Sequence, residues 1–309
     1  MSIKYYPFLR AKTYDVKAVA GCAKSLVQNG KIMPIFEPVS DPSTTLLKSA
    51  KAFGSVGLEV AVVVNPQVGA LIGSLAKTTK LLSDMIAAKA SVVPAFSVTP
   101  TTQVAEAHWF LTQFPGRSVC VHFGVPNAQV TSLLLRSQAT HVFLSGATNT
   151  AHQHSFLAAQ RALLSDGFKA QAKNAAYPAQ SFFGDLHLTY PTLGFAGFGD
   201  FAIVGYRFSP SGGPAYAVAI HMTEDFQAAG IFCNHFLSTS NFTPTDPAGK
   251  FGEAVAALAA YCQQHPGKLD FTMGCRELLQ HHAAGTYPGL GTVKRMSIQH
   301  HLELMCTVV

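Results

Sequence analysis

The chain has 309 residues, of which 48% are hydrophobic and only 12% charged, and its formal net charge is +6. This length is ample for a large buried core and is close to that of a single barrel domain. The basic residues are scattered, which excludes a continuous nucleic-acid-binding stripe but is compatible with a phosphate-bearing ligand.

Short runs of apolar residues recur along the first half of the chain, between 23 and 33 residues apart. They are IMPIF from Ile32, LEVAVVV from Leu58, SVVPAF from Ser91, SVCVHF from Ser118, HVFLS from His141 and FKAQA from Phe168. Each run has about the length of a buried strand. Helical stretches between them predict repeated βα units, in which right-handed crossovers join parallel strands.

The helical stretches carry start and stop signals. Asp41-Pro42, Thr101 or Thr102, and Pro126 stand where helices begin. A further helix is predicted over residues 156–164, with Gly167 just past its end.

The pattern changes after about residue 175. Residues 177–199 predict a long ordered loop, because they are rich in Phe, Gly, Pro and Tyr without a clear period. Strands at 201–205 and 215–222 flank a Gly/Pro-rich turn at 209–214 and predict a hairpin, which a strand at 231–238 extends. Helices are predicted at 250–264, at 276–283 and from about residue 292.

Together these elements predict one α/β domain over residues 1–309. We expect a modified (β/α)8 TIM-like barrel with a β-hairpin insertion in its C-terminal third. A doubly wound open sheet is the alternative, because the order of the strands does not follow from their spacing.

The six cysteines include no CxxC pair, which is typical of a reducing compartment. The start MSIKYYPFLRAK has no apolar stretch of the signal-peptide kind, and the longest apolar runs are too short to cross a bilayer. We therefore expect a cytoplasmic protein without a membrane partner.

Polar residues stand at several predicted strand ends, where the sites of parallel barrels lie. They are Glu37, Asn65, His122, Asn174 (next to Lys173) and His221. If they meet on one rim they can bind a ligand or perform acid–base chemistry, with Glu37, His122 and His221 as the catalytic candidates. Each can also be a structural polar group with satisfied hydrogen bonds.

Other residues are candidates for ligand binding. Arg10 and Lys12 either reach over the rim toward an anion or belong to a segment that plugs the barrel bottom. Asp185 and His187 can join Asp200 in holding a metal with hard donors, but no zinc or calcium motif is present, so no metal site is predicted.

Two further segments are compatible with a phosphate. Gly212 and Gly213 can present backbone amides to one, although a turn explains them equally well. Asp246-Pro247 predicts a helix start, and Lys250 in its first turn indicates a nearby anion. The histidines at 152, 154, 281, 282, 300 and 301 are interpreted as surface or core polar residues.

Motifs along nearly the whole chain resemble one bacterial family. They are YYPFLRAK, PIFEPV, VVNPQVG, PAF, KNAAYP, FFGDLHLTY, GFGDFAIVG, SPSGGPAYAVAIH, HFLS and PTDPAGKFGEA. Members of that family begin YYPYLRGK and carry GGPAYAVAIHL, and the family is loosely allied with the phage-type "beta protein" family. This chain departs from the pattern at Ala11, where Gly is expected, and at residues 209–211, where Ser-Pro-Ser replaces Ser-Glu-Ser.

The resemblance implies a role in anti-phage defence or in a mobile element, often beside a nuclease-like companion protein. It implies no reaction and no cofactor, so whether the protein is an enzyme stays open. We expect the rim to bind a nucleotide or a nucleic-acid end, with hydrolysis as a further step. The alternatives are a non-enzymatic adaptor in a nuclease-containing complex and a structural component that self-assembles.

Overall fold

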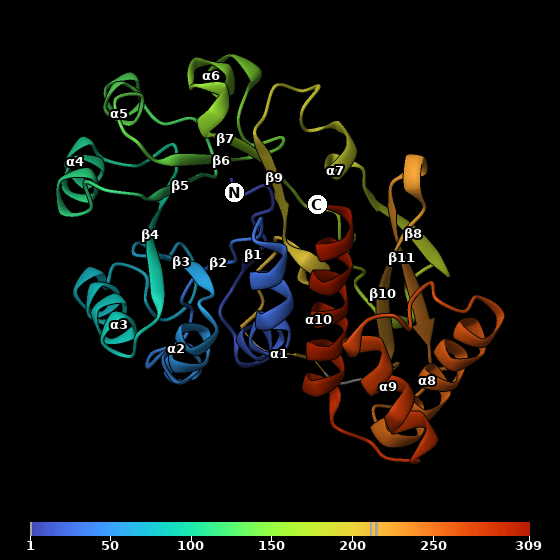
Figure 1. The fold of residues 1–309 in the computed structure, drawn as a ribbon. Coiled ribbons are helices and arrows are strands. Elements are labelled where there is room, and N and C mark those ends of the chain that lie inside the picture. The colour runs from blue at the N-terminus through green and yellow to red at the C-terminus, as the bar shows by residue number, and fades with distance from the viewer. Residues whose placement is uncertain (1, 211, 214–215) are drawn as a thin grey trace.

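The computed structural model describes residues 2–210, 212–213 and 216–309. Eight parallel strands form one sheet in the order β1-β2-β3-β4-β5-β6-β7-β9 (Figure 1). They are β1 (Phe8–Leu9), β2 (Ile35–Phe36), β3 (Glu59–Val63), β4 (Ser91–Val98), β5 (Val119–His122), β6 (Thr140–Leu144), β7 (Arg161–Ser165) and β9 (Gly197–Asp200). Tyr5, just before β1, forms a parallel bridge with Phe198 of β9, so the sheet is a nearly closed barrel.

Helices surround this barrel, as expected for a TIM-like fold. They are α1 (Thr13–Asn29), α2 (Thr44–Val56), α3 (Leu75–Ala87), α4 (Val104–Gln113), α5 (Ala128–Leu134), α6 (Thr150–Ser155), α7 (Leu186–Thr189) and α10 (Leu290–Val308). Short 3-10 turns lie at Ala158–Gln160, Asn174–Ala176, Ala202–Val204 and Gln227–Ala229. The predicted fold class is confirmed.

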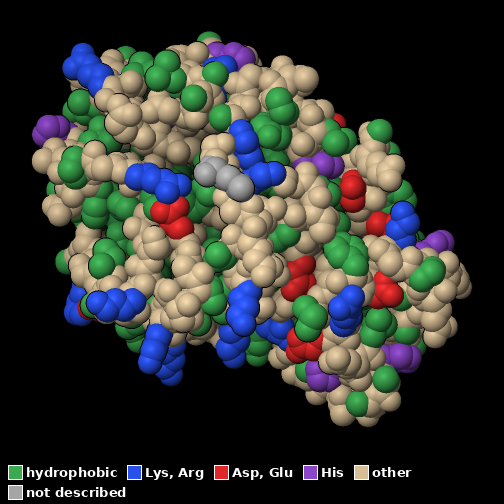
Figure 2. Space-filling model, viewed as in Figure 1, with side chains coloured by type: hydrophobic (Ala, Val, Ile, Leu, Met, Phe, Trp, Pro, Cys, Tyr) green, Lys and Arg blue, Asp and Glu red, His purple; other side chains and the backbone are tan. Residues whose placement is uncertain are grey.

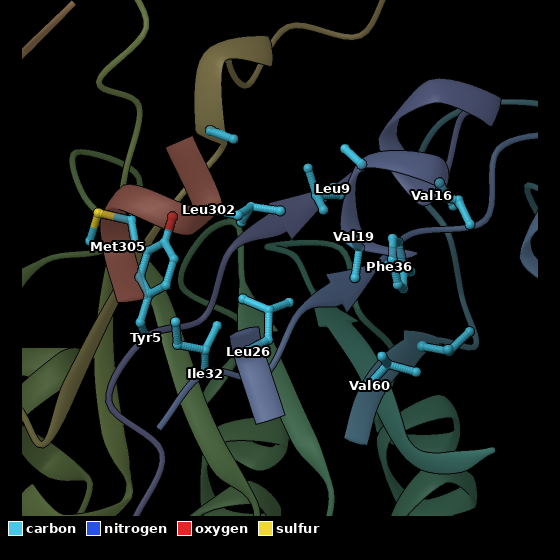
Figure 3. Close-up of a cluster of buried hydrophobic side chains, with 14 of the residues drawn as sticks. Tyr5, Leu9, Val16, Val19, Leu26, Ile32, Phe36, Val60, Leu302 and Met305 are labelled. Carbon is cyan, nitrogen blue, oxygen red and sulfur yellow. The ribbon is translucent and has the colours of Figure 1, made fainter. Parts of the chain in front are cut away.

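The barrel has an inner and an outer apolar core, because alternate strand residues point to opposite faces. The inner core is a packed cluster that includes Phe8, Ile35 and Val121. In the outer core, α1 and α10 lie side by side over β1 and β2, and Figure 3 shows Leu26 of α1 and Leu302 of α10 in this cluster.

A second, antiparallel sheet of three strands lies beside α10. Helix α10 stands between this sheet and α1 (Figure 1). Its strands are β8 (Gln180–Gly184), β10 (Ala219–Asp225) and β11 (Ile231–Leu237), and its helices are α8 (Pro247–Gln264) and α9 (Met273–Ala283). We call these five elements the accessory layer. One face of the sheet packs on α8 and α9, and the other belongs to the core that it shares with the barrel. The accessory layer is formed by the segments that follow β7 and β9, the seventh and eighth barrel strands.

Several predicted boundaries are wrong. The segment predicted as a helix over 156–164 contains most of β7, and the run from Phe168 is not a strand. The 177–199 loop contains β8, α7 and most of β9. The hairpin exists in the C-terminal third, but it joins β10 to β11, because residues 202–204 form a 3-10 turn instead of a strand.

The surface bears no continuous basic stripe on the face shown in Figure 2, where Lys and Arg side chains lie in separate groups among acidic and apolar ones. Among the described residues, none of the helices combines the length and the apolar character that crossing a bilayer would need.

Candidate functional site

The carboxyl-end mouth of the barrel holds a buried ion pair between Arg10 and Glu37. Glu37 has no exposed surface, and its second oxygen accepts a hydrogen bond from the backbone N–H of Gln67 at 2.6 Å. Arg10 donates from Nη2 to the carbonyl of Tyr206 at 2.7 Å. Both residues therefore hold loops together at the mouth. The Nε of Arg10 has no hydrogen-bond partner among the described residues, but Arg10 and Glu37 are both buried.

Aromatic rings pack together around this ion pair at the mouth. Tyr206 stacks on Phe123 with ring centroids 5.8 Å apart, and Phe201 lies 5.3 Å from Tyr206 and 5.5 Å from Phe8. The guanidinium carbon of Arg10 lies 5.4 Å from the centre of the Tyr206 ring. The expectation that Glu37 lies on an accessible rim is therefore wrong, because its side chain is fully buried.

Asn65 and His122 do not join a common rim either. The Asn65 side chain donates to the carbonyl of Ser97 at 2.9 Å and accepts from its N–H at 2.7 Å, which ties β3 to β4. His122 lies outside the barrel wall, because its neighbour Val121 points inward. Its placement on the rim was predicted wrongly.

His122 is the centre of a buried chain of histidines. Its Nε2 lies 3.0 Å from Nδ1 of His141, and its Nδ1 lies 3.3 Å from Nε2 of His152. Phe143 and Phe156 pack on the three rings. Burial, and secondarily the neighbouring rings, holds the pKa of His122 well below its usual value and lowers the pKa of His141 to about 3. These three histidines are therefore neutral and buried inside the barrel wall.

Asp185, His187 and Asp200 do not gather into the metal site considered above. Asp185 is exposed, His187 lies 3.7 Å from Asp225, and Asp200 accepts a hydrogen bond from Tyr5 at 2.8 Å. The only group of three metal-ligating side chains found among the described residues lies elsewhere. The expectation fails because Asp200 ends β9, whereas the other two flank the start of α7.

Buried polar side chains also join β9, β10 and α10. His301 lies 3.0 Å from the Thr223 hydroxyl through Nδ1 and 3.2 Å from Asp200 through Nε2. This order of hydroxyl, imidazole and carboxylate is that of a nucleophilic triad. All three residues are buried, and none lines a described cavity, so the network joins α10 to both sheets.

The remaining predicted binding residues lie apart from one another. Gly212 and Gly213 are exposed, and residues 211, 214 and 215 of the same turn lie outside the described part of the chain. Lys250 is buried in the first turn of α8 and donates to the carbonyl of Thr243. Lys12 donates to the carbonyl of Ser209. The predicted convergence of these residues with Glu37 on one rim is not found.

The largest described cavity, about 570 Å³, lies between α3 and α4 beside the ends of β3 and β4. Its polar lining groups already serve the fold: Asn65 bridges two strands, and Glu106 accepts from the backbone N–H of Gln103 at 2.8 Å. It has no basic side chain in its lining. Volume alone therefore does not make this cavity the functional site.

A smaller cavity of about 240 Å³ is lined by side chains that are better suited to binding a ligand. It lies where the connections after β7 and β9 meet β10 and the first two turns of α10. Its lining is Phe168, Asn174, Tyr177, Ile203, Val204, Val218, Ala219, His221, Leu290, Val293, Lys294 and Ser297. We call it the α10 pocket. Two predicted site residues, Asn174 and His221, are brought together here.

The charged residue in the described lining of the α10 pocket is Lys294. Its side chain is partly exposed, and its ammonium lies 4.0 Å from the buried carboxylate of Asp15. Burial, which the nearby lysines only partly offset, raises the pKa of Asp15. Lys12 is close enough for the Lys294 charge to add to burial in lowering the Lys12 pKa. An anion entering the pocket would act together with Asp15 in balancing these two cations.

His221 extends from the pocket wall into a second polar cluster. Its Nδ1 lies 2.7 Å from Nδ1 of His235, and the Cys233 sulfur lies 3.8 Å from the same nitrogen of His235. Burial lowers the pKa of His221 to about 3 and that of His235 to about 4, so both imidazoles are neutral near pH 7. One ligand atom from each of the three residues lies within 4.8 Å of the others, which makes them able to hold a metal.

Sequence reasoning missed Lys294, Cys233 and His235. The sequence does contain one indication of a metal site: Cys233 and His235 of β11 are two residues apart and so lie on one face of the strand. Lys294 gave no signal, because its approach to His221 depends on how α10 packs against β10.

A comparison of the chain with protein-family models and with curated proteins finds no match. The resemblance stated from the motifs therefore stays a prediction. One of its details has a physical basis here: Ala11 has a φ of 49°, in the left-handed region that favours the Gly expected at this position.

Proposed function

We propose that the protein binds a phosphate group, the terminal phosphate of a nucleotide or of a nucleic-acid end, in the α10 pocket. The observation that carries this proposal is the position of Lys294, which faces a pocket built from the seventh and eighth strand-to-helix connections and the start of a helix. TIM-barrel enzymes frequently bind phosphate at this place in the fold.

The start of α10 favours an anion in two ways. The helix has 19 residues, and Gly289 at its N-cap supplies no side-chain oxygen for the first backbone N–H groups. Those groups and the helix dipole place partial positive charge beside Leu290, which lines the pocket. Lys294, one turn further on, adds a full charge.

The pocket also limits the ligand. Sites for drug-sized ligands occupy about 300–1,000 Å³. A volume of about 240 Å³ suits a phosphate with a small attached group, so the rest of a nucleotide would extend outside. Hydrolysis is not included in the proposal, because Glu37 and His122, two of the predicted catalytic residues, do not line this pocket.

Calorimetric titration of the full chain with inorganic phosphate, and with a dinucleotide that carries or lacks a 5′-phosphate, tests the proposal. Lys294→Met should weaken binding of the phosphorylated probes by about 10- to 100-fold, because a hydrogen bond to a charged group contributes about 1.5–3 kcal/mol. Lys24→Met is the matched control, since Lys24 is an exposed lysine of α1 that does not line the pocket. Equal affinity in both variants, or no binding by the wild type, would overturn the proposal.

The biological setting in this proposal comes from the resemblance alone. It is a role in anti-phage defence or in a mobile element, whereas the cytoplasmic location is proposed from the cysteine pattern. Binding of a phosphorylated nucleic-acid end is the property of the α10 pocket that such a role would use.

A second function, as an adaptor for a nuclease-like companion protein, is favoured by an aromatic patch on the accessory layer. Phe182 on β8 is 40% exposed and lies 5.3 Å from Phe232, which lies 5.2 Å from the exposed Phe226. β8 is an edge strand of its sheet, and such edges can pair with another chain. Phe183, the next residue of β8, is buried and does not belong to this patch.

Purification of the tagged protein from its native host tests the adaptor function. We expect a stable complex that Phe182→Asp disrupts and that Leu157→Asp, at another exposed apolar residue, leaves intact. A complex that survives Phe182→Asp, or the absence of any complex, would contradict this function without affecting the phosphate proposal.

A further inference from the structure

Three potential metal ligands share one face of the accessory sheet. β10 and β11 are antiparallel, and their register places His221 directly opposite His235. Cys233 is two residues before His235, so its side chain points to the same face. The strand pairing thus brings two imidazoles and a thiol together without any loop, and the positions of their backbones are fixed by the sheet.

The distances are close to those that a tetrahedral zinc ion requires. With Zn–N of about 2.0–2.1 Å and Zn–S of about 2.3 Å, tetrahedral geometry separates two nitrogens by about 3.3 Å and a sulfur from a nitrogen by about 3.6 Å. The Cys233 sulfur lies 3.8 Å from Nδ1 of His235, and the two Nδ1 atoms are 2.7 Å apart. An ion between them has to separate the imidazole nitrogens by only about 0.6 Å.

The surroundings support a built site. The Ser181 hydroxyl lies 2.9 Å from Nε2 of His235, so it can fix which nitrogen of that ring faces the cluster. Metal-bound histidines usually have such a partner on their other nitrogen. The ring of Tyr177 packs on both imidazoles, with centroids 4.6 Å from His221 and 4.7 Å from His235.

We propose that His221, Cys233 and His235 bind one Zn²⁺ ion, with the fourth position left to water or to a group in the α10 pocket. Two imidazoles and a thiolate are donors of the borderline-soft kind that zinc prefers, whereas Mg²⁺ and Ca²⁺ prefer oxygen ligands. Three protein ligands with an open fourth position are typical of zinc sites that act on a ligand. On binding, the Cys233 thiol loses its proton to solvent and a Zn–S bond forms, so one proton is released per ion.

This site goes beyond the proposed function and does not depend on it. His221 is the one residue that the two share, because it also lines the α10 pocket. An ion at the cluster would add positive charge at the pocket wall opposite α10.

Metal alone is the probe that tests the site. The chelator-treated full chain is titrated with Co²⁺ and then with Zn²⁺. We expect one equivalent of Co²⁺ with a sulfur-to-cobalt charge-transfer band, its displacement by one equivalent of Zn²⁺, and release of one proton. Binding without the charge-transfer band, or no binding, would overturn the proposal, and this wild-type result does not depend on the folding of any variant.

Variants then assign the ligands. Cys233→Ser should lose the charge-transfer band, and His235→Gln should lose stoichiometric zinc. Cys306→Ser, at another cysteine, and His152→Gln, in the histidine chain of the barrel wall, should keep both. Retention of the band in Cys233→Ser, with thermal unfolding confirming a folded protein, would show that another cysteine binds the metal and would refute the assignment.

Discussion

The molecule contains two clusters of buried histidines that differ in one geometric property. In the barrel wall, His122 contacts His141 through Nε2 and His152 through Nδ1. The two nitrogens of one imidazole point in opposite directions, so these three rings form a chain that cannot converge on one ion.

In the accessory layer the donors converge. The Nδ1 atoms of His221 and His235 face each other, and the Cys233 sulfur approaches the same point. One member of this cluster also lines the α10 pocket, whereas the wall chain is enclosed by Phe143 and Phe156.

Burial and a low pKa therefore do not distinguish a functional histidine cluster from a structural one. Both clusters have both properties. Convergence of lone pairs and access from a cavity do distinguish them. The same contrast separates Glu37, which is sealed in the barrel mouth, from Lys294, which faces a pocket. Sealed groups should affect stability, and accessible groups should affect binding.

The largest expected effect concerns the sealed mouth. Glu37→Leu should lower the free energy of unfolding by about 3–5 kcal/mol, because it leaves the buried Arg10 guanidinium without its carboxylate. Adding Arg10→Met should restore most of the loss, since a buried ion pair can be replaced by apolar side chains of similar volume. Urea unfolding of the two variants measures this difference.

Phosphate titration of the double variant is the matching control. The double variant should bind phosphate like the wild type, because neither residue lines the α10 pocket. If it is stable but has lost binding, the mouth and the pocket are coupled, and the comparison between sealed and accessible groups breaks down.

Acidification should weaken the fold through the neutral histidines. Burial lowers the pKa of His141 to about 3 and that of His300 to about 4, and it holds that of His122 well below its usual value. An unfolded chain binds protons on these residues below about pH 6.5, whereas the folded chain does not. The free energy of unfolding should therefore fall from about pH 6.5 to about pH 4, by up to about 1.4 kcal/mol per pH unit for each histidine.

Urea unfolding at a series of pH values measures this slope. His141→Gln should reduce the slope by the contribution of about one proton. His282→Gln, at an exposed position, should leave the slope unchanged. A stability that stays constant between pH 6.5 and 5 would mean that the folded wall accommodates charged imidazoles, and the wall chain would no longer count as sealed.

The strands that were predicted correctly are those with long runs of Val, Ile and Phe, such as β3 and β4. β9 escaped prediction because it contains glycines, which indicate loops. Gly199 is needed there because a Cβ would lie 2.2 Å from the carbonyl oxygen of Tyr6, so glycine allows the close approach that nearly closes the barrel. β7 was assigned to a helix because Leu163 and Leu164 lie seven residues after Phe156 and Leu157, which is a helical spacing.

The site was predicted less well than the fold, for two physical reasons. A shift of one residue moves a strand side chain to the other face, and the sequence does not say which face of β5 points inward, so His122 was placed wrongly. The metal cluster depends on which strand pairs with β10. The predicted strand at 231–238 extended the hairpin, but the sequence does not give its register, so His235 was not placed opposite His221.

The smallest expected effect comes from removing one serine hydroxyl beside each histidine cluster. This prediction depends on the proposed zinc site. Ser181 lies 2.9 Å from Nε2 of His235, and Ser137 lies 3.4 Å from Nε2 of His141. Ser181→Ala should weaken zinc binding by about 10- to 100-fold, because the partner on the outer nitrogen orients the metal-bound ring. Ser137→Ala should leave zinc affinity unchanged, and each variant should lower the free energy of unfolding by about 1 kcal/mol.

Competition with a chromophoric chelator measures zinc affinity in both variants, and urea unfolding measures their stability. If Ser137→Ala weakens zinc binding as much as Ser181→Ala, the effect follows general destabilisation and His235 is not a ligand. If only Ser181→Ala weakens it at matched stability, the hydroxyl acts through His235. The two clusters then differ in function because the nitrogens of one converge beside a pocket, whereas those of the other point apart inside the barrel wall.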